Sequence, residues 1–177
     1  MAMDYQSDDL AVYPVGDPTM LTTAEPFEWN VGYLVDQPDT TEMLDVHSDR
    51  LSSVSYRIVN GVEALWASHT VVATSGDDDI RWYEIRNPSN TPYFYQQGSF
   101  APDTDYRWIS SLGVDGMGNM AIGYSISGPT QYPSVYYTGR LVGDPLGEAR
   151  AANDVEVESQ RCFERARVGV RVSFGFQ

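Results

Sequence analysis

The sequence predicts an all-β protein built from antiparallel four-stranded meanders, and three observations support this fold class. Aromatic residues make up 12% of the 177 residues, with 12 Tyr and 4 Trp among them. The 15 Gly and 10 Pro are spread along the chain and divide it into short segments rich in strand-forming residues. Apolar residues reach 42%, so the chain can build a core and does not have the composition of a disordered segment.

Residues 1–45 are expected to form an irregular, acidic N-terminal segment with peripheral strands. Short strand-like runs lie at 9–15 and 27–35. Pro14 would confine the first run to a sheet edge, because proline cannot donate a hydrogen bond to a ladder. The segment is further interrupted by Pro18, Pro26 and Pro38.

The next part of the chain, residues 51–97, reads as one antiparallel meander of four strands joined by short turns. The dipeptide Asn60-Gly61 separates the first two strands and is a strong hairpin signal, because both residues tolerate positive φ. The acidic run at 77–79 is expected to be an exposed hairpin tip. The four expected strands are LSSVSYRIV (51–59), VEALWASHTVVA (62–73), IRWYEIR (80–86) and TPYFYQQ (91–97).

A second meander is expected to begin at residue 106. DGMGN at 115–119 predicts a hairpin turn rather than a calcium loop, because an EF-type loop needs oxygen ligands where Met117 and Ile126 stand. GVEALWAS at 61–68 aligns weakly with GNMAIGYS at 118–125, which suggests a repeat. The three expected strands are YRWISSLGV (106–114), MAIGYSIS (120–127) and SVYYTGRLV (134–142).

Small meanders cannot bury both faces alone, so they must stack on neighbours. Radial stacking gives a β-propeller, and face-to-face stacking gives a β-sandwich. The leading interpretation is a partial β-propeller, with propeller-like blades over residues 46–147; the alternative is a β-sandwich.

Residues 148–177 differ in composition and are expected to form an atypical C-terminal tail. They hold five of the 11 Arg and the single Cys, but no Tyr or Trp. The run at 148–167 has the Ala, Glu and Arg content of a helix. The alternating apolar residues at 168–176 predict a final strand, which would pair back onto the sheet or join another copy through exposed sheet edges.

The net charge of −14 bears on partners and compartment. All 11 basic residues are Arg, and so acidic a surface argues against nucleic acid and anionic membrane as partners. The composition fits either a salty or extracellular habitat or a GC-rich genome. The N-terminal residues show no signal peptide, and one Cys cannot form an intrachain disulfide. The compartment therefore stays open, with an extracellular location as one alternative.

An ordered series of motifs covering about residues 36–147 resembles a group of large bacterial proteins that are propeller-like and mostly of unassigned function. The resemblance implies a β-propeller, but it carries no established catalytic residues. The group continues with further strands beyond the last motif, whereas this chain changes composition after Gly147. The motifs are LDVHSDRLSSVSYR (44–57), HTV (69–71), IRWYEIR (80–86), YQQGSFAPDTDYRW (95–108), DGMGNMAIGYSIS (115–127), YPSVYYTGR (132–140) and GDPLG (143–147).

Charged and aromatic residues on the expected strands are the candidate ligand-binding residues. A sialidase would use clustered Arg to bind a substrate carboxylate, with Tyr and Glu as a nucleophile pair. The S-x-D-x-G-x-x-W box of sialidase propellers is absent, and Arg on strands more often stacks on aromatic rings. The candidates are Arg81, Tyr83, Glu84, Arg107, Tyr137 and Arg140.

We therefore expect a noncatalytic binding or structural module, as part of a larger protein, with a protein or carbohydrate ligand. The alternative is a propeller-type glycan hydrolase, which would need two carboxylates about 5–10 Å apart in one cleft. No catalytic residue is assigned, and the sequence favours a function without catalysis.

No cofactor is expected, with Ca²⁺ as the alternative. Asp77, Asp79, Asp103 and Asp105 are weak metal candidates, but turn formation and pairing of Asp103 with Arg107 explain the last two more simply. The only other metal-binding side chains of note are two histidines far apart in sequence. His69, within an apolar run, is expected to be buried and hydrogen-bonded rather than catalytic.

Overall fold

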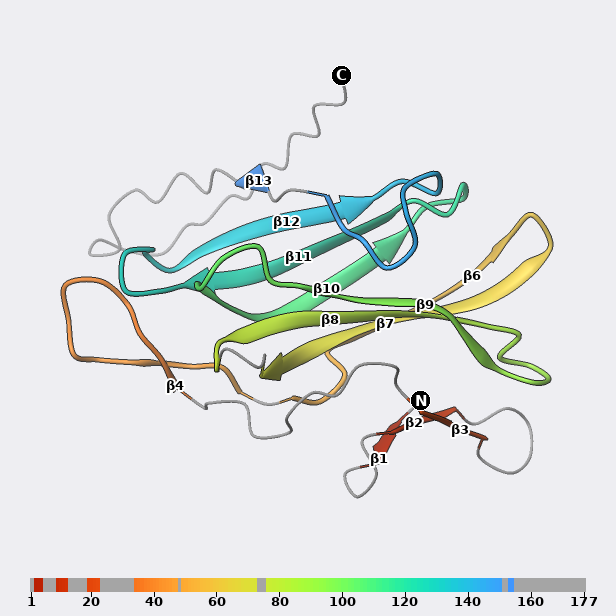
Figure 1. Ribbon diagram of the computed structural model, residues 1–177, viewed down its shortest axis with the longest axis horizontal. Coiled ribbons are helices and arrows are strands. Elements are labelled where there is room, and N and C mark those ends of the chain that lie inside the picture. The colour runs from red at the N-terminus through yellow and green to blue at the C-terminus, as the bar shows by residue number, and fades with distance from the viewer. Residues whose placement is uncertain are drawn as a thin grey trace, which may run out of the picture.

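The structure is a computed structural model that describes residues 34–47, 49–72 and 76–150, together with the backbone of a few short strands outside these ranges. Throughout this described part the regular elements are antiparallel strands and none is a helix, which confirms the all-β prediction. Accordingly, no helix there is long and apolar enough to cross a membrane. Figure 1 shows two stacked sheets with the same strand order.

The first sheet is a four-stranded meander, as predicted for residues 51–97. Its hairpin between the first two strands contains Asn60 (φ 51°) and Gly61 (φ 79°), the pair of left-handed residues that a two-residue turn requires. The strands lie in chain order and are β6 (Ser53–Val59), β7 (Val62–Val72), β8 (Asp78–Arg86) and β9 (Tyr93–Phe100).

The second sheet repeats this order. Its first turn is held by Asp115, whose Oδ1 accepts hydrogen bonds from the backbone nitrogens of Met117 and Asn119 at 2.8 and 2.9 Å. Gly118, with φ 91°, supplies the left-handed position, so the predicted hairpin turn is confirmed. The strands are β10 (Tyr106–Val114), β11 (Met120–Ser127), β12 (Ser134–Arg140) and β13 (Asn153–Asp154).

The smaller elements, β1 to β5, all precede the two main sheets in the chain. Three short strands pair in a sheet of their own, and β4 (Leu34–Val35) pairs with β5 (Leu44–Asp45). Strand β2 falls within the run predicted at 9–15, and β4 ends the run predicted at 27–35. The three-stranded sheet consists of β1 (Ala2–Asp4), β2 (Asp9–Val12) and β3 (Thr19–Thr22).

The predicted helix over 148–167 is wrong at residues 148–150, which are not helical, and at Asn153–Asp154, which form β13 and pair with β12. The exposed edge of β12 offers backbone partners that helix propensity does not take into account. The rest of that predicted helix from residue 155, and the predicted strand at 168–176, lie outside the described residues.

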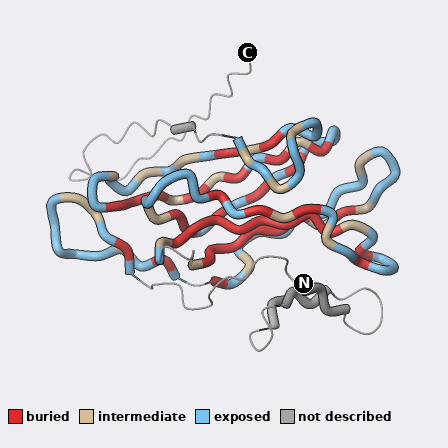
Figure 2. The backbone as a smooth tube through the Cα atoms, in the orientation of Figure 1, coloured by how far each residue is buried: buried red, intermediate tan, exposed pale blue. Residues whose placement is uncertain are grey.

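The main core lies between the two sheets, where β10 packs against β6, β7 and β8. Figure 2 shows the buried residues concentrated along the facing strands. Each large apolar side chain buried there contributes roughly 1.5–3 kcal/mol to folding. The core consists of Ala64, Trp66, Ile80, Trp82, Phe100, Leu112, Val114, Met120, Ile122, Tyr124 and Ile126.

The two sheets do not use equivalent faces to contact each other. In β7 the residues toward the second sheet are Ala64 and Trp66, whereas in β11 the residues toward the first sheet include Ile122 and Tyr124. The sequence repeat aligns Ile122 with Leu65, and Leu65 packs in the cluster on the opposite face of β7. If the face of the first sheet that carries Trp66 is called its front, the repeat makes the face of the second sheet that carries Ile122 its back. The front of the first sheet therefore packs against the back of the second.

Candidate functional site

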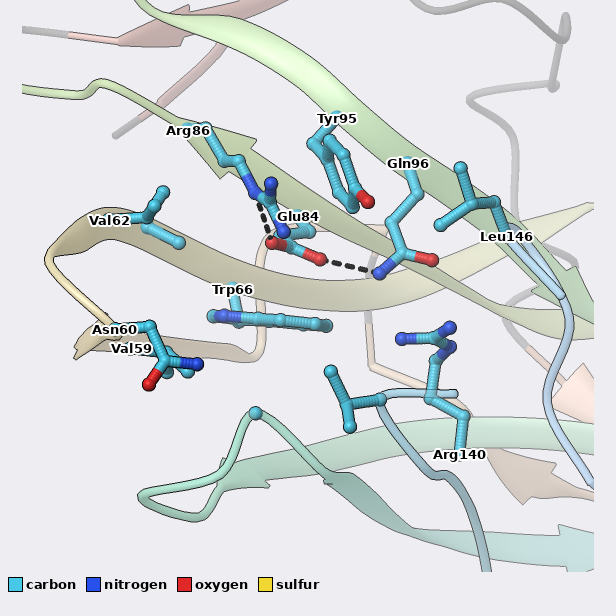
Figure 3. A pocket seen from close by; sticks show the side chains of 13 residues that line it. Val59, Asn60, Val62, Trp66, Glu84, Arg86, Tyr95, Gln96, Arg140 and Leu146 are labelled. Carbon is cyan, nitrogen blue, oxygen red and sulfur yellow. Dashed lines mark hydrogen bonds and ion pairs between the residues drawn. The ribbon is translucent and has the colours of Figure 1, made fainter. Parts of the chain in front are cut away.

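A pocket of about 220 Å³ opens between the two sheets, at the end that holds the Asn60-Gly61 turn. Figure 3 shows that side chains from both sheets converge on it. A second hollow, of about 330 Å³ between residues 99–102 and 147–149, has Glu148 as its only ionisable side chain. The first pocket is lined by Val59, Asn60, Val62, Ala64, Trp66, Glu84, Arg86, Tyr95, Gln96, Gly118, Arg140, Val142 and Leu146.

Aromatic rings supply part of the pocket wall. Trp66 is only 2% exposed, and its ring stacks on Trp82 with the ring centres 6.3 Å apart. Tyr95 is 36% exposed, and the guanidinium of Arg86 lies 3.2 Å from the centre of its ring. The stacking fixes the Arg86 side chain at the mouth of the pocket through a cation–π contact.

Of the residues that the structure describes, Glu84 is the only carboxylate that lines the pocket, and both of its oxygens are engaged. Oε1 accepts from Arg86 Nε at 2.7 Å, and Oε2 accepts from Gln96 Nε2 at 2.5 Å. The register pairs Glu84 on β8 with Gln96 on β9, which places the two side chains on the same face. Gln96 Oε1 accepts in turn from the backbone nitrogen of Gly147 at 3.2 Å.

Arg140, the last residue of β12, enters the pocket from the second sheet (Figure 3). It is 3% exposed, and its guanidinium lies 5.9 Å from the ring centre of Trp82. Its Nη2 donates to the backbone oxygen of Asp144 at 3.0 Å, whereas its buried Nε has no hydrogen-bond partner in the described part of the chain.

The structure brings together two of the six candidate ligand-binding residues, Glu84 and Arg140. Arg81 and Tyr83 alternate with Glu84 along β8 and therefore lie on the opposite face of the sheet. There the ring of Tyr83 packs with Ala67 and Ile85, away from the pocket.

The other two candidates, Arg107 and Tyr137, also lie apart from the pocket. The Nη2 of Arg107 donates to Asp103 Oδ1 at 2.6 Å, as predicted, and its guanidinium lies 5.7 Å from the centre of the Phe100 ring. Tyr137 pairs with Gly123, and its side chain is 38% exposed on the face that points away from the first sheet.

The prediction that residues 77–79 form an exposed hairpin tip is wrong for two of the three residues. Asp78 and Asp79 begin β8, and each is only 2% exposed. Burial raises the pKa of each carboxyl to about 7. Both oxygens of Asp78 and Oδ1 of Asp79 lack hydrogen-bond partners within the described ranges, so the protonated forms suit this environment best.

The described residues contain no group of three or more His, Cys, Asp or Glu side chains arranged to hold a metal ion. Asp103 Oδ1 is engaged by Arg107 and by the backbone nitrogen of Asp105, at 2.6 and 2.9 Å. His69 is fully buried, as predicted, with Nδ1 2.8 Å from the Asp49 backbone oxygen and Nε2 2.9 Å from the Tyr83 hydroxyl.

Trp66, Arg86, Tyr95 and Gln96 also line the pocket but were not among the predicted site residues. One signal could have found Arg86, because it lies two residues from Glu84 and so shares its face of the strand. Trp66 and Gln96 pair with Glu84 across β7 and β9, which only the strand register reveals.

No protein-family model matches the chain, and neither does any characterised protein or solved structure.

Proposed function

We propose that the protein is a noncatalytic binding module of propeller type, and that the pocket lined by Trp66, Glu84, Arg86, Tyr95, Gln96 and Arg140 is its ligand site. A few convergent polar groups beside aromatic surface are typical of small-molecule sites. Aromatic rings flanked by amide and guanidinium donors suit the faces and hydroxyl groups of sugars, so a carbohydrate is the ligand class that this lining favours.

The noncatalytic assignment depends on one observation: the described part of the chain places a single carboxylate in the pocket. A glycan hydrolase by the usual mechanism needs two carboxyl groups facing each other across the bond that breaks. Of the four acidic residues that could supply them, Glu84, Asp103, Asp105 and Asp144, only Glu84 lines the pocket. Because Arg86 and Gln96 already occupy its oxygens, Glu84 is better suited to shape the wall than to transfer a proton.

Front-to-back packing of the two sheets supports the propeller-type interpretation over a sandwich. In a sandwich of two equivalent sheets, matching faces meet, whereas radially arranged blades present the front of one to the back of the next. Leu65 lies on the face of the first sheet that points away from the second sheet, whereas Ile122 lies on the face of the second sheet that points toward the first. Because the repeat aligns these two residues, the packing matches the front-to-back arrangement of radial blades. The motif resemblance to large propeller-like bacterial proteins agrees with this proposal.

Binding to a glycan array, followed by calorimetry, tests the proposed function. Tyr95→Ala should weaken binding of the identified glycan by about tenfold or more, since it removes a ring at the pocket mouth. Tyr93→Ala is the matched control, because Tyr93 lies on the same strand at 47% exposure and does not line the pocket. Absence of any glycan binding, or equal loss in both variants, would overturn the proposal.

The hydrolase alternative has its own measurement. If the wild-type protein cleaves a panel of nitrophenyl glycosides and Glu84→Gln abolishes the cleavage, the protein is an enzyme and the noncatalytic proposal is wrong. We expect no cleavage by either protein.

One surface favours the structural role that the sequence also allowed. It is the apolar face of β6 that points away from the second sheet. Val54, Tyr56 and Ile58 are 50%, 46% and 58% exposed on the back face of β6. By the repeat, this back face corresponds to the face through which the second sheet packs on the first. We propose that another sheet covers it, from a second copy or from a longer parent protein. Light scattering of wild type and Tyr56→Ser distinguishes a self-associating surface from a monomer.

A further inference from the structure

We infer that the pocket recognises a sugar that carries a carboxylate, and that Arg140 binds this group; the inference rests on the proposed function. The first step is a charge count. Among the described residues, the side chains that line the pocket and are charged at neutral pH are Glu84, Arg86 and Arg140, which leaves one positive charge. The chain as a whole carries −14, so this pocket is a local cationic site in a strongly acidic protein.

The excess charge belongs to Arg140. Glu84 and Arg86 neutralise each other through their ion pair at 2.7 Å. Within the described ranges no carboxylate lies at ion-pair distance from Arg140. Asp144 is close enough for Arg140 to help lower its pKa, but both of its carboxylate oxygens accept from Arg150 at 2.7 Å.

The unpaired polar atoms around the pocket are hydrogen-bond donors. Trp66 Nε1 and Arg140 Nε are both buried, and neither has an acceptor among the described residues. Glu84 and Gln96 Oε1, the nearby acceptors, are already engaged. Neither nitrogen is open to the pocket, but together they show that donors outnumber acceptors around the guanidinium, which favours a ligand that supplies acceptor oxygens to its accessible part. Figure 3 shows the Trp66 ring and the Arg140 guanidinium on the same side of Glu84.

The size and shape of the pocket favour a single sugar ring with one acidic group. Its volume of about 220 Å³ is below the roughly 300–1,000 Å³ of sites for drug-sized ligands. A guanidinium presents its donors in a planar fork that matches a carboxylate, and the adjacent rings of Trp66 and Tyr95 can pack against the sugar. Free oxyanions such as sulfate share the charge but lack the ring.

Calorimetry with three probes tests this inference on the wild-type chain. The probes are methyl β-D-glucuronide, its uncharged methyl ester and inorganic sulfate. We expect the glucuronide to bind at least about tenfold more tightly than the ester or sulfate, and its affinity to fall as salt is raised. Equal binding of the glucuronide and the ester would overturn the carboxylate inference and leave the binding-module proposal standing. Sulfate binding as tight as the glucuronide would overturn the sugar part, and no binding by any probe or on the glycan array would overturn both proposals.

Variants then locate the carboxylate. Arg140→Gln should reduce glucuronide affinity by about tenfold or more and leave affinity for the ester nearly unchanged. Arg50→Gln removes the same charge from an exposed position outside the pocket and should have no effect. Because Arg140 is buried, Arg140→Gln could fail to fold. In that case Arg140→Lys is used, which keeps the charge but loses the planar fork of guanidinium donors. Its ratio of glucuronide to ester affinity is compared with that of the wild type. An unchanged ratio in a folded Arg140 variant would contradict the role of Arg140.

Discussion

His69 Nε2 lies 2.9 Å from the hydroxyl of Tyr83, on the face of the first sheet away from the pocket. The imidazole is fully buried, and burial lowers its pKa to about 4. His69 therefore acts as a neutral hydrogen-bonding residue that joins β7, β8 and the Asp49 backbone. Protonation of this one side chain is one way in which acid can destabilise the fold.

The first prediction concerns acid stability. The pKa of His69 is lower in the folded than in the unfolded protein, so its contribution is complete above about pH 6.5 and is lost as pH falls toward 4. Urea unfolding should show stability falling by roughly 1 kcal/mol per pH unit across this window. The measurement is clearest in an Asp78→Asn/Asp79→Asn background. The two aspartates have raised pKa values, so they stabilise the fold as pH falls and would mask the effect of His69. A flat profile in that background would show that His69 does not titrate as described.

The second prediction concerns those two aspartates. Their folded pKa values of about 7 exceed the ordinary 3.8. Their contribution to the free energy of unfolding is therefore complete below about pH 3.8 and is lost as pH rises through 7. At pH 8 the single variants Asp78→Asn and Asp79→Asn should therefore raise the free energy of unfolding by about 1 kcal/mol or more. Glu42→Gln removes an exposed charge as the control. Destabilisation by both variants at pH 8 would contradict the prediction.

A third prediction tests the close approach of β9 to the loop after β12. A Cβ on Gly98 would lie 2.1 Å from the backbone oxygen of Gly147, whereas one on Gly113 would meet nothing within 4 Å. Gly98→Ala should therefore destabilise the protein by about 1–3 kcal/mol, and Gly113→Ala should be nearly neutral. Thermal unfolding of the two variants measures the difference. Equal effects would mean that the loop does not pack on β9.

The fourth prediction concerns the turn at 115–119. Asp115 accepts hydrogen bonds from two backbone nitrogens and from Asn119 Nδ2, at 2.8–2.9 Å. Asp115→Ala should cost about 1–2 kcal/mol because these donors lose their acceptor. Asp115→Asn retains one acceptor oxygen and should cost less. Chemical denaturation that ranks the two variants in the opposite order would contradict this account of the turn.

The fifth prediction concerns metal ions. Because Arg107 occupies an oxygen of Asp103 and the described acidic residues do not converge in threes, neither Ca²⁺ nor EDTA should shift the melting temperature. A saturable upward shift with Ca²⁺ at constant ionic strength would contradict this expectation and return Asp77, Asp79, Asp103 and Asp105 to consideration as ligands.

The sequence by itself determined the local elements. Alternation and turn chemistry placed the strands from β6 to β12 within a few residues, because Asn60-Gly61 and the turn at Asp115 admit few backbone conformations. Burial of His69, pairing of Asp103 with Arg107 and stacking of Arg on aromatic rings also followed from residue type. The strands and turns depend on short-range geometry, which a run of ten residues already contains.

Only the tertiary structure decided which residues share a site. Glu84 and Arg140 meet because β8 and β12 belong to facing sheets, and Trp66 and Gln96 join them through strand register. Arg81 and Tyr83 are excluded although they adjoin Glu84 in sequence, because neighbouring residues on a strand point to opposite faces. Burial of Asp78 and Asp79 and pairing of β13 with β12 likewise depend on surfaces supplied from elsewhere in the chain. Long-range packing is set by the sum of many weak contacts, so no local pattern records it.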